Sequence, residues 1–189
     1  FFYYLNALAK TIAGRRKPTD GKAVEGEEEQ GLLGYWHNLP YLIGRVAEHG
    51  SPHILINNAG AGRWLPILET SAEEAAAMMA LPYLAAFNLT RELLPGMLKR
   101  RSGHIVNVTS VAARLAWPGA VAYSAARAAM DGFTSALRAD LYGSGVSVML
   151  AMFGTVESPY WEHNPGSRER LPARAAAPAR RSSLRLARS

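Results

Sequence analysis

The stretch GHIVNVT at residues 103–109 decides the fold of this chain. Its β-branched residues and uncharged centre are typical of a strand buried inside a parallel sheet. Two further runs have the same character, HILIN at 53–57 and VSVML at 146–150. Helix-length segments separate the three runs. The order strand, helix, strand, helix, strand predicts a parallel α/β layer.

Helix start signals stand between the first two runs. Thr70-Ser71 can start a helix whose first turn carries Glu73 and Glu74, because carboxylates favour the positive end of the helix dipole. Pro82 then predicts the first turn of a second helix, which runs to about residue 101. Pro95 is expected to kink or end that helix near its last turn.

Two more helices follow from the pattern. Residues 120–142 are rich in alanine and end at Gly143, and residues 36–49 carry apolar side chains at helical spacing and end at Gly50. The predicted fold is a partial Rossmann-like α/β layer. Its strands lie parallel and adjacent, with the helices near 82–100 and 120–142 packed against them.

Composition limits the class of protein. A chain of 189 residues with 49% hydrophobic content suits one globular domain with a core of its own. No apolar run approaches the ~20 residues of a membrane span, so a cytoplasmic location is expected. Association with a membrane surface stays open, because residues 1–9 are apolar and aromatic. The five histidines are scattered and cysteine is absent, so no metal site is predicted.

The basic charge belongs to the end of the chain. Residues 1–163 hold fourteen basic and fourteen acidic side chains, whereas residues 164–189 hold seven arginines and one glutamate. A nucleic-acid surface would gather its cations on a folded face, so no nucleic-acid partner is predicted. We divide the chain into an atypical segment or linker (1–35), a partial Rossmann domain (36–163) and a basic tail expected to be disordered (164–189).

Three residues form a chemically meaningful set. Ser110 ends the second strand, Tyr123 follows thirteen residues later, and Arg127 stands four residues after the tyrosine. A spacing of four places the tyrosine and the cation on one helix face. A tyrosine hydroxyl can donate its proton to a carbonyl oxygen if a nearby cation lowers its pKa from the ordinary value of ~10. A serine hydroxyl at the strand end can hold the same oxygen.

The turn Asn57-Asn58-Ala59-Gly60 closes the first strand. Together with Ser110, Tyr123 and Arg127, it resembles the short-chain dehydrogenase/reductase family over roughly residues 46–160. The resemblance implies an oxidoreductase that moves hydride between NAD or NADP and an alcohol or carbonyl substrate. The apolar residues around the site leave a lipophilic substrate open.

The family's roles map onto this chain residue by residue. The resemblance implies that Tyr123 is the acid and base, that Ser110 binds the carbonyl oxygen, and that Arg127 contacts the ribose and the tyrosine. It also implies a set of cofactor contacts: Asn57, Ala59, Gly60, Tyr123, Arg127 and Val156.

The sequence departs from the family at four places. Arg127 replaces a lysine, Pro82 replaces an asparagine, and Phe153-Gly154 replaces Pro-Gly. Residues 1–50 contain no Thr-Gly-x-x-x-Gly-x-Gly turn, which holds the cofactor pyrophosphate in the family. Weak cofactor binding is therefore expected of this chain, and the choice between NAD and NADP stays open.

A second class of function also stays open. A truncated or inactive relative could act through protein contact, since family members pair through the helices that match 82–100 and 120–142. Small residues on the second of these helices allow close helix approach: Ala125, Ala126, Ala128 and Ala129. A homo-oligomer is expected under either interpretation.

Overall fold

The computed structural model describes residues 50–60, 62–115, 117–156, 161–162 and 164–171. The strands are β1 (Ile54–Asn57), β2 (Gly103–Ser110) and β3 (Val146–Phe153), and the α-helices are α3 (Ala72–Met79), α4 (Ala85–Arg100) and α5 (Val121–Asp140). A π-helical segment, η3 (Ala80–Leu84), joins α3 to α4. The 3-10 helices are η2 (Ile67–Glu69), η4 (Val111–Ala113) and η6 (Arg168–Arg170).

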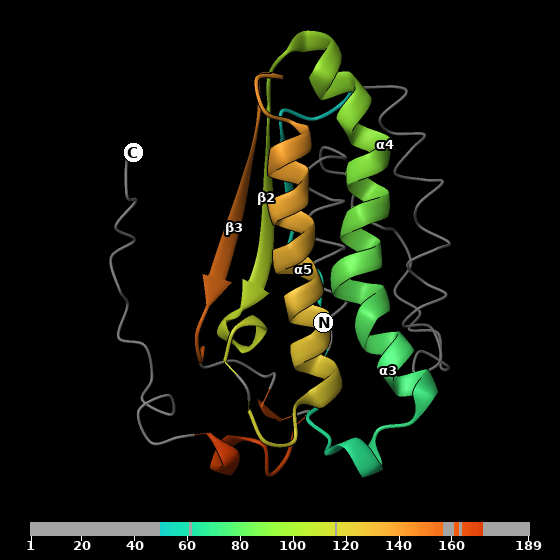
Figure 1. Cartoon of the computed structure of the whole chain (residues 1–189), viewed down its shortest axis with the longest axis vertical. Coiled ribbons are helices and arrows are strands. Elements are labelled where there is room, and N and C mark those ends of the chain that lie inside the picture. The colour runs from blue at the N-terminus through green and yellow to red at the C-terminus, as the bar shows by residue number, and fades with distance from the viewer. Residues whose placement is uncertain (1–49, 61, 116, 157–160, 163, 172–189) are drawn as a thin grey trace, which may run out of the picture.

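The three strands form one sheet in the order β1-β2-β3, and both pairs are parallel. This arrangement confirms the predicted partial Rossmann-like layer. Leu55 stands beside Ile105, which stands beside Val148, so one row of apolar side chains crosses the sheet. Helices α4 and α5 lie together over one face of it (Figure 1). The core between them is made of buried apolar residues: Leu55, Leu93, Met97, Ile105, Leu137, Leu141 and Val146.

The start of α3 follows the predicted signals. The Ser71 hydroxyl accepts a hydrogen bond from the Glu74 main-chain N–H at 3.2 Å, which satisfies one of the helix's unpaired donors. Hydrogen bonds from its own backbone and from the Ser71 side chain hold the pKa of the Glu73 carboxyl below its ordinary value.

The prediction for Pro82 was wrong. Pro82 is fully buried and lies inside η3. The elements α3, η3 and α4 follow one another without a break, so Pro82 does not mark the start of a new helix. Proline removes one main-chain donor and its ring crowds the carbonyl four residues earlier. The wider i→i+5 turn of a π-helix accommodates both effects. Pro95 also lies inside α4 and does not end it, since the helix continues to Arg100.

The helix predicted over residues 36–49 lies outside the described residues. Gly50, its predicted stop, has a φ of +80°. Among the described residues of the segment predicted as a tail, Asn164, Ser167 and Leu171 are buried. Within the described parts of the chain, none of the helices has the length and apolar character required to cross a membrane.

Candidate active site

The first part of the site is the carboxyl end of β2. Ser110 is the last residue of that strand and is half-buried. Its Oγ accepts a hydrogen bond from the Ala112 N–H at 3.2 Å and so caps η4. The short helix η4 packs against α5, and Ala112 shares an apolar cluster with Tyr123. Strand β2 therefore ends with Ser110 next to η4, which packs against the helix that carries Tyr123 and Arg127.

Tyr123 and Arg127 are both buried on α5, with 8% and 9% of their surfaces exposed. The Arg127 Cζ lies 4.8 Å from the centroid of the Tyr123 ring, a cation–π arrangement. The Thr109 hydroxyl donates a hydrogen bond to the Arg127 carbonyl oxygen at 3.0 Å, which fixes this turn of α5 against β2. The predicted pair therefore does share one face of the helix.

Gly60 completes this group. A Cβ atom placed on Gly60 would lie 2.7 Å from Nη2 and 2.9 Å from Nη1 of Arg127. These distances are shorter than van der Waals contact, so the guanidinium packs against the bare Cα of the turn. Arg127 consequently contacts the turn after β1 and the Tyr123 ring at once. The structure brings together three predicted site residues that are far apart in the sequence.

The side chain of Asn57 points elsewhere. Its Nδ2 donates to the Thr90 hydroxyl at 3.2 Å and to the Asn107 Oδ1 at 2.8 Å. The Asn107 Nδ2 in turn donates to the Thr134 hydroxyl at 2.9 Å, and all four residues are buried. This buried amide network links β1 and β2 to α4 and α5. The Asn57 amide nitrogen is used in this network, and the cofactor contact predicted for Asn57 stays a prediction, now for its main chain.

The other two predicted cofactor residues lie at the ends of strands. Ala59 is half-buried in the turn after β1. Val156 follows β3 and is exposed, and its carbonyl oxygen accepts a hydrogen bond from the Trp161 indole N–H at 3.0 Å. Both positions are at the carboxyl ends of parallel strands, where open α/β sheets bind ligands.

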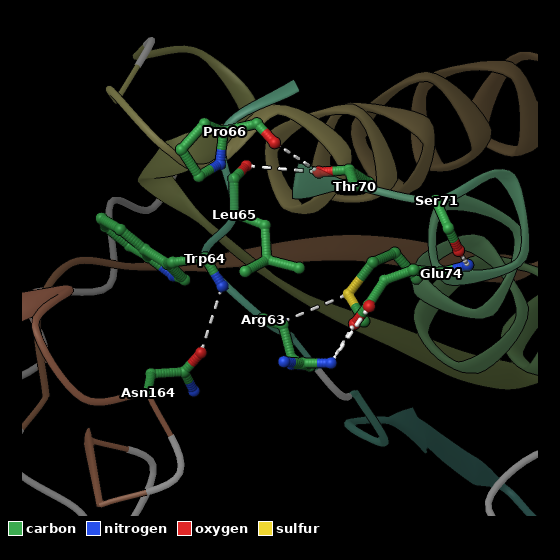
Figure 2. A network of polar contacts seen from close by, with 9 residues as sticks. Arg63, Trp64, Leu65, Pro66, Thr70, Ser71, Glu74 and Asn164 are labelled. Carbon is green, nitrogen blue, oxygen red and sulfur yellow. Dashed lines mark hydrogen bonds and ion pairs between the residues drawn. The ribbon is translucent and has the colours of Figure 1, made fainter. Parts of the chain in front are cut away.

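The sequence analysis missed Trp64. Its ring centroid lies 6.0 Å from that of Tyr123 and 6.1 Å from that of Trp161, and it is buried. Trp117 and Leu171 pack into the same cluster. Figure 2 shows the Trp64 N–H directed at the Asn164 side chain, at 3.2 Å. The available signal was position alone, because Trp64 follows the turn after β1 by only four residues.

An ion pair connects the segment after η4 to helix α5. Arg114, just after η4, donates from Nε and Nη2 to the two carboxylate oxygens of Asp131 on α5, at 2.7 and 3.1 Å. These hydrogen bonds lower the pKa of the Asp131 carboxyl and raise the pKa of Arg114. The pair holds the segment that follows Ser110 against the helix of Tyr123.

The donors in this region fit one half of a nicotinamide cofactor. Arg127 supplies a cation, and the missing side chain of Gly60 lets its guanidinium lie directly against the turn after β1. Neither group can replace a glycine-rich turn for the pyrophosphate. Among the residues that the structure describes, no three His, Asp or Glu side chains gather where they could hold a metal ion.

The model of the short chain dehydrogenase family matches residues 37–168. That is more than half of the chain, and it includes the sheet, α3 to α5 and the Ser110–Tyr123–Arg127 group. The chain belongs to the short chain dehydrogenase family.

Individual relatives agree with this assignment. Dehydrogenase RED3 from Cochliobolus heterostrophus is 44% identical over 94 residues, which are 50% of this chain and 48% of that protein. A gluconate 5-dehydrogenase from Burkholderia cenocepacia, solved with NADP and tartrate, is 26% identical with a TM-score of 0.60, over 72% of this chain and 51% of that one. A 4-hydroxyisoleucine dehydrogenase complexed with NADH is 28% identical, also with a TM-score of 0.60, over 72% and 59%. The chain spans about half the length of the curated relatives it matches.

Proposed function

We propose that this chain represents an NAD(P)-dependent oxidoreductase that interconverts an alcohol and a carbonyl compound, with Tyr123 as the acid and base. One observation carries the proposal. The Arg127 guanidinium lies against the Tyr123 ring and the Gly60 main chain at the same time. This places a cation beside a tyrosine at the turn where family members bind their cofactor.

Each side chain has a defined part in the proposed reaction. A bound nicotinamide would supply the hydride for reduction. The Tyr123 hydroxyl gives its proton to the carbonyl oxygen as the alcohol forms, and it takes that proton back in the reverse direction. Ser110 donates a hydrogen bond to the same oxygen. Its own oxygen already accepts from the Ala112 N–H, so the hydroxyl proton remains for the substrate.

The proposed cofactor contacts are Arg127, Tyr123 and the main chain of Asn57, Ala59, Gly60 and Val156. Arg127 can donate to ribose hydroxyls as a lysine would, through a planar group held in one orientation. The solved relatives carry NADP in one case and NADH in another. The proposal therefore specifies a nicotinamide cofactor and leaves the choice between NAD and NADP open.

The test is the Tyr123→Phe variant, which keeps the ring and removes the hydroxyl. We expect NAD(P)H-dependent reduction to fall by about 10²–10⁴-fold, the usual share of general acid catalysis. Tyr142→Phe is the matched control, because Tyr142 is 92% exposed near the end of α5. An undiminished rate in Tyr123→Phe would remove this residue from the mechanism.

A groove between α4 and α5 supports a second property, self-association. It has a volume of about 530 Å³ and is lined by Tyr83, Phe87, Ala129, Gly132, Phe133, Ala136, Leu137 and Asp140. The rings of Tyr83, Phe87 and Phe133 lie 5.9–6.2 Å apart, and Phe87 is 41% exposed. We propose that a second copy of this chain covers this groove, as the helix pairing of the family implies. A catalytically inactive relative could act through this same surface.

Gly132 offers a sharp test of the pairing. A Cβ atom there would meet nothing within 4 Å, so Gly132→Glu introduces no clash at Cβ and places a charge in the groove. We expect sedimentation at tens of micromolar to show a dimer for the unmodified chain and a monomer for this variant. Ser135→Glu, exposed on α5 but outside the groove, should remain dimeric. A strictly monomeric unmodified chain would end this proposal.

A further inference from the structure

Two inward-facing side chains of β2 donate hydrogen bonds to α5. The Asn107 Nδ2 donates to the Thr134 hydroxyl at 2.9 Å, and the Thr109 hydroxyl donates to the Arg127 carbonyl oxygen at 3.0 Å. Both donors are buried, with 0% and 3% of their surfaces exposed. Side chains alternate along a strand, so residues 107 and 109 point to the same face, over which α5 lies (Figure 1). The two bonds therefore set the register of α5 on β2.

The Thr109 bond lies where the candidate site is assembled. Thr109 directly precedes Ser110, and its acceptor belongs to Arg127, one helical turn after Tyr123. The first turns of α5 lie beside the carboxyl end of β2 (Figure 1). In the proposed reaction Ser110 and Tyr123 reach the same carbonyl oxygen. The separation between the strand end and this turn of the helix therefore has to be held.

The helix does not need this bond to satisfy its own carbonyl. Arg127 lies inside α5, where a main-chain carbonyl oxygen accepts from the N–H four residues later, here that of Asp131. A carbonyl oxygen has two lone pairs, so the Thr109 hydroxyl is a second donor to it. Thr109→Val keeps the shape of the side chain and leaves this carbonyl paired. The change should therefore affect folding little, because the large losses come from buried groups left without a partner.

The position of α5 should nevertheless respond to this change. A methyl group in place of the hydroxyl stays at roughly 3.3–3.6 Å from a carbonyl oxygen, farther than the 3.0 Å of the Thr109 bond. The contact between Arg127 and Gly60 reports this position, because a Cβ atom on Gly60 would lie only 2.7 Å from the Arg127 Nη2. Loss of the Thr109 bond should let this turn of α5 move away from the strand ends and loosen that contact.

A second connection near this turn is more exposed. Arg114 pairs with Asp131, one turn beyond Arg127 on α5, but 64% of the Arg114 side-chain surface is exposed. Solvent screens such a pair, and it adds little rigidity. The buried hydroxyl of Thr109 is therefore the firmer of these two connections to α5.

We infer that Thr109 is a positioning residue of the candidate active site. Its hydroxyl holds the turn of α5 that carries Tyr123 and Arg127 at the distance from Ser110 at which both hydroxyls reach one carbonyl oxygen. This inference rests on the proposed function and adds a residue to it. Thr109 acts through the main chain of the helix and touches neither substrate nor cofactor.

The first test follows the contact between Arg127 and Gly60 by NMR and needs no turnover. We expect an NOE between the Gly60 α-protons and the Arg127 guanidinium protons in the unmodified chain, and a weaker one in Thr109→Val. Thr109→Ser keeps the donor and should restore it. Ser51→Ala is the matched control. The Ser51 hydroxyl also donates to a helix carbonyl, that of Leu93 on α4 at 2.6 Å, but Ser51 precedes β1 at the opposite end of the sheet.

The second test is the rate of NAD(P)H-dependent reduction per folded molecule. A small misplacement of reacting groups lowers a rate steeply, so we expect kcat of Thr109→Val to fall about tenfold with little change in KM. Thr109→Ser should recover most of the rate, and Ser51→Ala should match the unmodified chain.

Several results would overturn the inference. They are an absent NOE in the unmodified chain, an unchanged NOE or rate in Thr109→Val, a Thr109→Ser variant no better than Thr109→Val, and an equal loss in Ser51→Ala. If Thr109→Val fails to fold, Thr109→Cys gives the same comparison, because a thiol is a weaker donor than a hydroxyl.

Turnover distinguishes this inference from the proposed function. A rate that Tyr123→Phe abolishes but Thr109→Val leaves unchanged would sink the positioning role and leave the function standing. An NOE that depends on the Thr109 hydroxyl, in a chain that oxidises no NAD(P)H, would sink the function and leave Thr109 as the residue that places α5.

Discussion

At the scale of single residues, Thr134 shows that buried polar groups have hydrogen-bond partners in the interior. It is fully buried, its hydroxyl accepts from the Asn107 Nδ2 at 2.9 Å, and it donates to the Met130 carbonyl at 2.7 Å. Thr134→Val keeps the shape and removes both roles. We expect a loss of about 1–3 kcal/mol in the free energy of unfolding, because a buried amide donor is left unpaired.

Urea unfolding measures this loss. Ser135→Ala is the matched control, since Ser135 is the exposed neighbour on the same helix and should change stability little. A Thr134→Val variant as stable as the unmodified chain would mean that the amide network contributes nothing to the fold.

Substitutions at Gly60 and Arg127 should have coupled effects on the free energy of unfolding. Gly60→Ala places a Cβ 2.7 Å from the guanidinium, and overpacking of this kind costs about 1–3 kcal/mol. Lysine lacks the planar head that fills this space, so Arg127→Lys should relieve part of the loss. We expect a coupling energy of at least ~0.5 kcal/mol in the double-mutant cycle, measured by chemical unfolding. Strictly additive losses would show that the two groups do not share this space.

At the scale of elements, the Arg114–Asp131 pair joins η4 to α5. The hydrogen bonds from Arg114 lower the pKa of the Asp131 carboxyl. A carboxyl whose pKa is lowered in the folded state stabilises that state above its ordinary pKa of about 3.9, and the contribution is lost as the pH falls through the lower folded value.

The pair therefore predicts a specific pH dependence. Asp131→Asn should lower the melting temperature slightly at pH 6, and the difference from the unmodified chain should shrink as the pH falls below about 4. Added salt should also reduce the difference, because Arg114 is largely exposed. A difference that stays constant from pH 6 to pH 2.5 would contradict the assignment of the lowered pKa to this pair.

At the scale of the whole molecule, the decisive quantity is cofactor affinity. The pyrophosphate carries two negative charges, and residues 1–50 contain no glycine-rich turn to receive them. Each lost charge-assisted hydrogen bond costs about 1.5–3 kcal/mol. We expect this chain to bind NAD(H) or NADP(H) no better than roughly millimolar.

Calorimetry or nicotinamide fluorescence can measure this affinity directly. Arg127→Ala should weaken it further, because this cation is the described charge closest to the Gly60 turn. Micromolar binding would show that another part of the chain receives the pyrophosphate, and it would favour a working enzyme over an inactive relative.

The sequence by itself determined the class of fold and the local spacing of the candidate site. Three apolar strands separated by helix-length segments leave few arrangements other than a parallel layer. The helix start at Thr70-Ser71 and the shared face of Tyr123 and Arg127 also followed from the sequence, because both depend on neighbours within one helical turn.

Only the tertiary structure decided which distant groups meet. The Asn57 amide faces the interior because Asn107 and Thr90 offer it partners there, and no local pattern encodes those partners. Pro82 sits inside a continuous helical run because a π-helical turn absorbs it. The main chain of Trp64, whose ring lies beside that of Tyr123, donates a hydrogen bond to Asn164, a hundred residues later in the sequence. The spacing of apolar residues in the sequence indicates which residues are buried. Which residues they pack against is determined only by the tertiary structure.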